Sequence, residues 1–232
     1  MKKLFLIPAR GGSKGIPGKN IKLFGNRPLI YYTIDAANEA FELGDRIAVS
    51  TDSTKIAEVV RRYGDYVPFM RPAELATDSA GSREVILHAL DFFEQKDEQF
   101  DCIVLLQPTS PFRKGTHVKE ALKQYLPSFD MVVSAFETKS NPYYVLFEEN
   151  SSGFIEKSKR GNFIRRQDCP KVYEFNGAIY VINPKSIRSE NLADFKRTKV
   201  YEMNAGDSVD LDTPDDWEYA EYLLQKKEMN SL

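Results

Sequence analysis

The chain alternates between short, largely apolar runs and longer stretches that are apolar at helical spacing. The short runs are Leu4–Ala9, Arg46–Ser50, Cys102–Leu106 and Met131–Phe136. The amphipathic stretches are Leu29–Phe41, Thr54–Tyr63 (after a candidate N-cap at Ser53), Ser82–Glu94 and Gly115–Tyr125. Strands without polar alternation are typical of burial on both faces, and regular alternation with helices is typical of a parallel sheet. The pattern therefore predicts an α/β fold of three layers, with helices on both faces of a mostly parallel sheet.

The pattern changes after about residue 137. Shorter strand-like segments follow, separated by polar turns and rich in basic and aromatic side chains: Tyr143–Glu148, Gly153–Ile155, Asn162–Arg165 and Tyr173–Ile182. The chain then closes with an amphipathic helix at Asp215–Lys226, whose inner side carries Trp217, Ala220, Leu223 and Leu224. There is no internal repeat and no Gly/Ser-rich linker. We expect a single domain over residues 1–232, with a β-rich arm at about residues 140–180.

Composition narrows the class of protein. Hydrophobic residues make up 42% of the 232 residues, enough for a large core, which argues against general disorder. The formal net charge of −2 argues against a bulk nucleic-acid binder. Two cysteines, Cys102 and Cys169, make neither a disulfide framework nor a spaced metal site, and no apolar run is long enough to cross a bilayer. We expect a cytoplasmic protein with no nucleic-acid or membrane partner.

A glycine-rich segment, Pro8–Asn20, follows the first predicted strand. It contains four glycines and the cations Arg10, Lys14 and Lys19. Loops at this edge of a parallel sheet bind ligands, and glycine lets backbone N–H groups approach phosphate oxygens. Its spelling matches neither the P-loop nor the dinucleotide-binding fingerprint, which argues against ATPases and dehydrogenases. Composition leaves two interpretations, a phosphate cradle or a surface turn with solvated cations.

Two aspartates near the end of the chain, Asp210 and Asp212, are separated by one residue. In an extended segment both carboxylates point to the same side, and such a pair suits Mg²⁺ together with water and phosphate oxygens. The alternative is an acidic turn in which Asp212-Thr213-Pro214 caps the final helix.

Five motifs together resemble those of the CMP-sialic acid synthetases (acylneuraminate cytidylyltransferases). They are Ala9-Arg-Gly-Gly-Ser-Lys-Gly-Ile-Pro-Gly-Lys-Asn20, Arg71-Pro-Ala-Glu-Leu-Ala-Thr-Asp78, Leu106-Gln-Pro-Thr-Ser-Pro-Phe-Arg113, Asn176-Gly-Ala-Ile-Tyr180 and Asp207-Ser-Val-Asp-Leu-Asp-Thr213. Their order is that of the family, and they span nearly the whole chain. The resemblance implies a Rossmann-like nucleotidyltransferase fold. It also implies a homodimer in which the protruding β-rich arms help complete the partner's sugar pocket.

The resemblance further implies a reaction. A sugar hydroxyl attacks the α-phosphorus of CTP and expels pyrophosphate, which yields the CMP derivative of a nonulosonic acid. The nucleotide-binding residues implied are Ala9, Arg10, Ser13, Lys19, Asn20, Arg71 and Ser82, and the sugar-binding residues are Gln107, Arg166 and Tyr180. Catalytic roles fall to Arg10, Lys19, Asp210 and Asp212, of which the two aspartates hold Mg²⁺, or Mn²⁺ in its place.

The identity of the sugar acid stays open. Sialic acid enzymes of this family carry basic residues where this chain has Glu174 and Tyr144. The candidate acceptors are N-acetylneuraminate, its deaminated form and legionaminate-like sugars. A Kdo-type acid is an alternative, although those enzymes usually read Arg-Tyr-Gly-Ser-Thr-Arg in the first loop. A non-catalytic nucleotide-binding module is another, and the presence of Lys19, Asp210 and Asp212 together argues against it. The arm could also fold back on its own domain.

Overall fold

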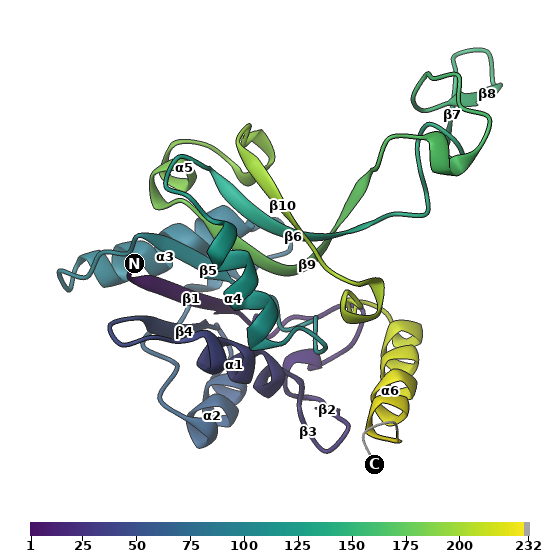
Figure 1. Ribbon diagram of the computed structural model, residues 1–232. Helices are drawn as coiled ribbons and strands as arrows, with labels where there is room; N and C mark the ends of the chain where they lie inside the picture. Colours follow the sequence, from purple (N-terminus) through teal and green to yellow (C-terminus); the bar gives the residue numbers. More distant parts are fainter. Residues whose placement is uncertain (230–232) are drawn as a thin grey trace.

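The computed structural model describes residues 1–229, so the last three residues of the predicted domain lie outside the described part. A six-stranded sheet forms its centre, in the order β10 (Thr198–Glu202), β6 (Met131–Glu137), β9 (Tyr173–Ile182), β5 (Cys102–Leu105), β1 (Lys3–Pro8) and β4 (Arg46–Ser50). Only β9 within this sheet runs antiparallel to its neighbours, β5 and β6. The mostly parallel sheet is therefore confirmed (Figure 1).

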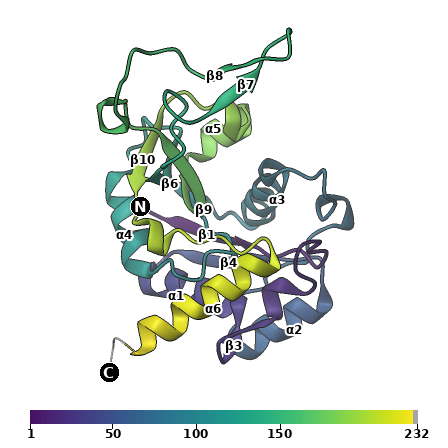
Figure 2. The same cartoon turned by 90° about the vertical axis from the view of Figure 1, so that its right-hand side faces the viewer.

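Helices cover both faces of the sheet. One face carries α1 (Leu29–Ala40), α2 (Thr54–Tyr63) and α4 (Gly115–Gln124), and the other carries α3 (Ser82–Glu94) and α5 (Pro184–Ser189). The last helix, α6 (Pro214–Met229), packs Trp217 and Ala220 against Phe24 and Ile16, beside the glycine-rich segment (Figure 2). The three predicted layers are confirmed. None of the helices in residues 1–229 is long and apolar enough to cross a membrane.

Shorter elements complete the fold. Two small hairpins pair β2 (Leu23–Phe24) with β3 (Arg27–Pro28) and β7 (Phe147–Glu149) with β8 (Ile155–Lys157). Single 3-10 turns occur at Lys19–Ile21, Ala73–Leu75, Arg166–Asp168, Leu192–Asp194 and Ala205–Asp207. The predicted N-cap is confirmed, because the Ser53 hydroxyl accepts a hydrogen bond from the N–H of Ile56 at 3.4 Å.

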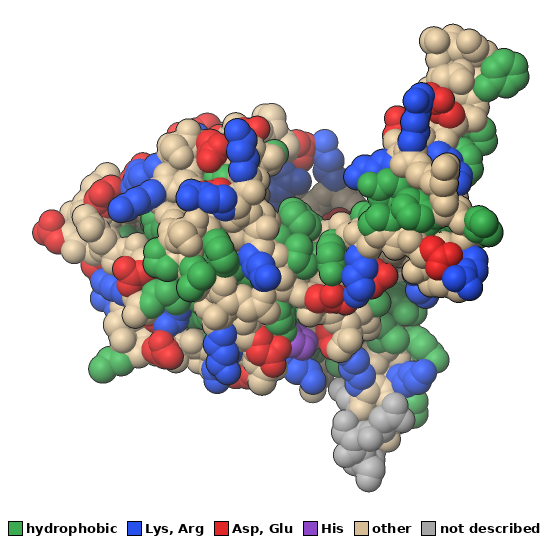
Figure 3. Space-filling model, turned by 45° about the horizontal axis from the view of Figure 1, so that its top comes forward, with side chains coloured by type: hydrophobic (Ala, Val, Ile, Leu, Met, Phe, Trp, Pro, Cys, Tyr) green, Lys and Arg blue, Asp and Glu red, His purple; other side chains and the backbone are tan. Residues whose placement is uncertain are grey.

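The chain leaves the sheet after β6 and returns to it at β9. Between them, the β7–β8 hairpin stands away from the body of the molecule (Figures 1 and 3). The predicted bounds of the strand Tyr173–Ile182 are confirmed. The sequence placed it among the short strands of the β-rich region, whereas in the structure this strand, β9, lies in the central sheet. The prediction of a strand at Asn162–Arg165 is wrong: the segment has no neighbouring strand, and the Arg165 side chain donates two hydrogen bonds of 2.9 Å to Asp168.

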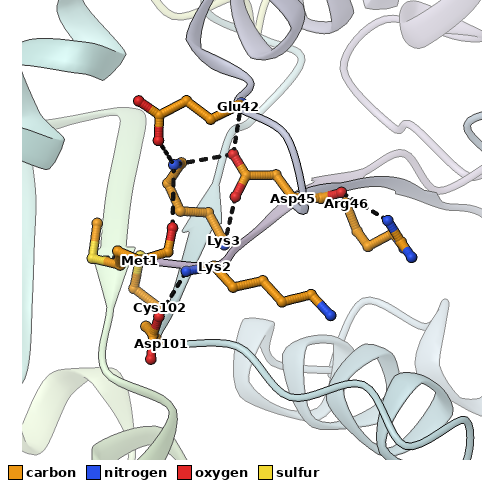
Figure 4. Close-up of polar contacts among 8 residues, drawn as sticks. All are labelled: Met1, Lys2, Lys3, Glu42, Asp45, Arg46, Asp101 and Cys102. Carbon is orange, nitrogen blue, oxygen red and sulfur yellow. Dashed lines mark hydrogen bonds and ion pairs between the residues drawn. The ribbon is translucent and has the colours of Figure 1, made fainter.

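At the end of the sheet opposite the glycine-rich segment, a buried ion pair joins the first residue of β1 to the residue before β4. The Lys3 ammonium lies 3.0 Å from Asp45, which also accepts the Lys3 N–H at 2.8 Å (Figure 4). Burial would lower the pKa of Lys3, but the carboxylates of Glu42 and Asp45 outweigh it and the pKa is raised. The Cys102 thiol nearby has its pKa raised to about 12, mainly by burial. These groups have their partners within the fold. The candidate site lies at the other end of the strands.

Candidate active site

Two adjoining cavities lie where β1 and β5 end. The larger, of about 420 Å³, is lined by Pro8, Arg10, Ser13, Lys14, Gly15, Lys19, Asn20, Gln107, Pro108, Thr109 and Asp212. The smaller, of about 180 Å³, is lined by Pro8, Arg10, Arg71, Ala80, Gly81, Ser82, Val85 and Leu105. Pro8 and Arg10 belong to both. Ligands of open α/β sheets bind at this edge, so the two cavities form one candidate site for an elongated ligand.

The glycine-rich segment is fixed from both sides. The Gly11 N–H donates to the Asp52 carboxylate at 2.9 Å, after β4, and the Asn20 amide donates to the Arg10 carbonyl at 3.0 Å. A Cβ on Gly15 would lie 2.1 Å from the Asp212 carbonyl oxygen, far inside van der Waals contact. Glycine is therefore required at Gly15 for the segment around Asp212 to pack against the loop.

Lys19 connects the first and last predicted motifs. Its buried ammonium donates to the Leu211 carbonyl at 2.5 Å and to the Asp212 carboxylate at 2.9 Å. The Leu211 N–H donates in turn to the Thr109 carbonyl at 2.9 Å. Three segments that are distant in the sequence thus meet at one point on the wall of the larger cavity.

The cations Arg10 and Lys14 share a carboxylate partner. Asp78 lies 2.9 Å from the Arg10 guanidinium and 2.6 Å from the Lys14 ammonium, and its pKa is lowered chiefly by Lys14 and also by Arg10. The interpretation of Lys14 as a merely solvated cation is therefore incomplete, because it both lines the cavity and forms an ion pair. An incoming phosphate would compete with Asp78 for these two cations.

Arg71 forms part of the wall of the smaller cavity. It is buried, and it donates to the Ser50 hydroxyl at 3.0 Å and to the Ser50 carbonyl at 2.6 Å. Burial lowers its pKa to about 10, an effect opposed by the charge of Asp52 and reinforced by that of Arg10. Arg71 is thus no solvent-facing turn residue, and Ser82 at the start of α3 lines the same cavity.

The aspartate pair divides into a buried and an exposed carboxylate. Asp210 has a buried oxygen, Oδ1, with no hydrogen-bond partner among the described residues. Burial raises its pKa and Asp212 adds to the shift, while Thr109 and Lys19 oppose it. The final helix is capped by Thr213 and Asp216, which exchange hydrogen bonds of 2.8 Å and 3.2 Å. Asp212 is therefore not needed as the helix cap.

These two carboxylates fit a hard divalent cation. The unpartnered oxygen of Asp210 and the exposed carboxylate of Asp212 are oxygen donors of the type that Mg²⁺ prefers. Within residues 1–229 no group of three or more His, Cys, Asp or Glu side chains is arranged to hold a metal ion. A cation held here would need further ligands from water and substrate oxygens.

The predicted sugar-binding residues are not all in one place. Gln107 lines the larger cavity. Tyr180 is half-buried on β9, and its pKa is raised by burial and by the charge of Asp210. Arg166 lies exposed on the arm and lines neither cavity. Among the nucleotide residues, Ala9 lines neither cavity either: its side chain is in the core, and its N–H donates to the Ser50 carbonyl at 2.9 Å.

Comparison with known proteins identifies the family. The family model described as cytidylyltransferase matches residues 4–231, nearly the whole chain. The chain belongs to the cytidylyltransferase family. It is therefore a nucleotidyltransferase.

Relatives of this cytidylyltransferase include sugar-acid enzymes. A CMP-N,N'-diacetyllegionaminic acid synthase of Legionella pneumophila is 35% identical over 97% of each chain. An N-acylneuraminate cytidylyltransferase of Streptococcus agalactiae serotype V is 37% identical over 98% of this chain but 56% of its own length. A solved CMP-2-keto-3-deoxy-manno-octonic acid synthetase complexed with CTP superposes with a TM-score of 0.71, covering 98% of this chain and all of its own, at 17% identity. This last likeness concerns the fold.

Sequence reasoning gave no role to several residues in or next to the walls of the two cavities. Asp78, Thr109 and Arg113 all occur within motifs that were recognised, yet none was given a role. Thr109 lines the larger cavity, and its buried hydroxyl opposes the rise in the pKa of Asp210. Arg113 is buried and donates to the carbonyls of Gln107 and Ala178 at 2.9 and 3.1 Å. Their presence in the motifs was the available signal, but their partners lie elsewhere in the chain.

Proposed function

We propose that this cytidylyltransferase transfers CMP from CTP to the anomeric hydroxyl of a nonulosonic acid and releases pyrophosphate. The observation that carries the proposal is the contact of Lys19 with Asp212 on the wall of the larger cavity, which Arg10 also lines, with Asp210 close enough to feel the charges of both. A reaction at the α-phosphorus needs cations for the polyphosphate and an acceptor pocket next to it. The names of the two relatives that act on legionaminic and neuraminic acids support a nonulosonic acceptor.

The proposed division of the site follows from its two cavities. The smaller one, with Arg71 and Ser82, takes the cytidine, since a buried guanidinium can donate to the carbonyl of the base. The larger one takes the triphosphate and the sugar acid, against Arg10, Lys19 and Gln107. Arg10 and Lys19 screen the negative oxygens of the transferred phosphoryl group and of the leaving pyrophosphate.

Mg²⁺, or Mn²⁺ in its place, is the proposed metal, and Asp210 and Asp212 are the residues that would hold it. When bound, it would neutralise phosphate charge during the transfer. The chain's own contribution is to present Asp210 from a buried position and Asp212 from beside Lys19. A raised pKa also makes Asp210 a candidate acceptor for the proton of the attacking hydroxyl.

A homodimer built through the arm is part of the proposal. Large apolar side chains are exposed on this segment, including Phe154 (72%), Ile155 (70%) and Ile164 (89%). An isolated two-stranded hairpin is marginal in water, and exposed apolar side chains on it favour an interface (Figure 3). Because Arg166 lies on the same arm and away from both cavities, we propose that it contacts the sugar carboxylate in the partner's site.

A cytoplasmic location fits this function. The described chain has two free thiols, Cys102 and Cys169, and its proposed substrate CTP is a nucleotide of the cytoplasm. Fractionation of the producing cells tests the point, and recovery of the protein outside the cytoplasmic fraction would contradict it.

Pyrophosphate release tests the reaction. The enzyme is incubated with CTP, Mg²⁺ and, separately, N-acetylneuraminate, its deaminated form, N,N'-diacetyllegionaminate and Kdo. We expect release with at least one nine-carbon acid, none without an acid, and loss of release when the metal is chelated. The acid with the highest kcat/KM identifies the acceptor. Release with Kdo alone, or CTP binding without release for any acid, would contradict the proposal.

A further inference from the structure

Strand β9 bends at Gly177, close to Gln107, which lines the cavity proposed for the sugar acid. Gly177 has φ of +70°, which favours glycine, and the pairing of β9 with β6 changes register between Val133 and Ala135. A Cβ on Gly177 would lie 3.1 Å from Gln107 Oε1 and 3.8 Å from Asp210 Oδ2. The bend therefore lies between a predicted sugar-binding side chain and a predicted metal-binding one.

Asn176, the residue before the bend, is only 4% exposed and has hydrogen-bond partners at both ends of its amide. Its Oδ1 accepts from the Ser134 hydroxyl at 2.6 Å and from the Ala178 N–H at 3.1 Å. Its Nδ2 donates to the Ser208 hydroxyl at 2.9 Å. One side chain thus connects β6, the residues on both sides of the bend, and the segment that leads to Asp210.

The partners of Asn176 extend these connections. Ser134 accepts the Ile179 N–H at 2.8 Å, just after the bend. Ser208 donates to the Asn204 carbonyl at 2.9 Å, which closes the turn two residues before Asp210. Buried amides and hydroxyls whose bonds are all made favour one arrangement of the segments that they join.

The opposite side of the bend is held by Arg113. Its guanidinium donates to the Ala178 carbonyl and to the Gln107 carbonyl, at 3.1 and 2.9 Å. The Ala178 N–H is bonded to Asn176 and the Ala178 carbonyl to Arg113, so this one residue is fixed from both directions. Asn176 and Arg113 line neither of the two cavities of the site, so neither contacts a ligand bound there.

We propose that Asn176 is a positioning residue: it sets the spacing between Gln107 and Asp210 across the Gly177 bend. Its action is indirect, through Ser208 on the segment of Asp210 and through Ala178, which Arg113 joins to the segment of Gln107. This inference rests on the proposed function of the site. In such a site, a misplacement of about 1 Å between groups that act on the substrate lowers turnover by about 100-fold.

The test compares Asn176→Ala with Asn183→Ala. Asn183 is a matched control, since it directly follows β9 and is 8% exposed. Both ends of its amide are hydrogen-bonded, to the carbonyls of Pro127 and Phe129 and to the Lys185 N–H. We expect N176A to lower kcat about 10- to 100-fold and to leave the Kd for CTP within about twofold, because the smaller cavity is built from other elements. N183A should lower the melting temperature and leave kcat within about twofold.

A milder pair keeps the test valid if N176A fails to fold. Ser208→Ala removes the link between Asn176 and the segment of Asp210, together with the bond from Ser208 to the Asn204 carbonyl. Ser186→Ala removes a hydroxyl of equal exposure (8%) that bonds to Asp130 far from the site. We expect S208A to lower kcat about fivefold to tenfold, with the Kd for CTP unchanged, and S186A to affect only stability. Equal kcat effects within either pair would overturn the inference.

A second readout separates this inference from the proposed function. Hydrogen–deuterium exchange is followed on peptides covering residues 107–113 and 203–212 in the unliganded protein. We expect faster exchange in both peptides for N176A and parental exchange for N183A. If the parental protein turns over no acid, the proposed function fails, while the exchange rates still test the contacts of Asn176. If it turns over an acid and the variants exchange alike, the inference fails alone.

Discussion

Among single residues, Lys19 has the clearest expected effect. Its ammonium contacts both Leu211 and Asp212 on the wall of the larger cavity. Lys19→Ala should lower kcat about 100- to 1,000-fold, because a positioned cation is lost where phosphate charge develops. The control is Lys22→Ala, which removes an exposed ammonium that lies 4.2 Å from the centre of the Trp217 ring. Steady-state pyrophosphate release measures both, and the melting temperature checks that K19A is folded. Turnover of K19A near that of K22A would contradict the assignment.

Two glycines of the same loop allow a second prediction at the residue scale. Gly15→Ala places a methyl group 2.1 Å from the Asp212 carbonyl, whereas Gly12→Ala meets nothing within 4 Å. G15A must therefore displace the segment of Asp212, and we expect kcat/KM to fall about 100-fold. G12A should retain parental kcat/KM to within about threefold, since exposed substitutions without new contacts are usually mild. Equal losses in both variants would show that loop flexibility, and not the contact with Asp212, is what matters.

At this scale the sequence identified types of residue better than their contacts. Arg10, Lys19 and Gln107 were expected at the site from their motifs, and all three line the larger cavity. The pairing of Lys14 with Asp78 was not predicted. It depends on two loops with α1, β4 and α2 between them in the sequence, and neither spacing nor composition shows how such loops fold over one another.

Among the elements, strands were predictable where both faces are buried. β4 and α2 have the predicted bounds, because β4 is a short apolar run and the apolar positions of α2 recur at helical spacing. β10 was not predicted, since only Tyr201 of its five residues is buried. The antiparallel direction of β9 was also not predicted, because it follows from the arm returning the chain to the sheet from the opposite end.

The junction of β6, α5 and β10 gives a prediction for stability. Asp130 is buried, and its carboxylate accepts hydrogen bonds from the Arg197 N–H at 2.8 Å, from the Arg197 guanidinium at 2.6 Å and from Ser186 at 2.8 Å. Asp130→Asn should lower the free energy of unfolding by about 2 kcal/mol at pH 7, because charge-assisted bonds are lost. Asp168→Asn is the control, since Asp168 has an equivalent but exposed pairing with Arg165 and should cost at most about 1 kcal/mol.

From the same contacts of Asp130 we expect the stability of the fold to depend on pH. Hydrogen bonds from Arg197 hold the pKa of Asp130 well below its usual range. A carboxyl group whose pKa is lowered by folding stabilises the fold fully above its unfolded pKa of about 3.9 and loses that contribution as the pH falls further. The difference in unfolding free energy between the parental protein and D130N should therefore shrink from pH 7 to pH 3, as measured by urea unfolding. A difference that is constant with pH would contradict this account.

For the whole molecule, the proposed dimer predicts that the arm of one subunit serves the site of the other. Within one chain the β7–β8 hairpin of the arm stands away from the body of the molecule (Figure 1). Arg166, on the same arm, lines neither cavity. A closed dimer places identical surfaces against each other, so an arm that crosses the interface reaches the partner's site, and the partner's arm returns the contact. Arg166 and Lys19 would then act on the same substrate from different subunits.

Complementation between two inactive variants tests this arrangement. Arg166→Ala and Lys19→Ala homodimers should each have little activity, since every site lacks one residue. Heterodimers purified through two different tags should regain about half of the parental turnover, because one of the two sites then contains both residues. If Arg166 serves the site of its own chain, each site of the heterodimer carries one lesion and turnover stays low. Failure to recover any heterodimer after co-expression would contradict the dimer itself, while an active R166A homodimer would remove Arg166 from the site.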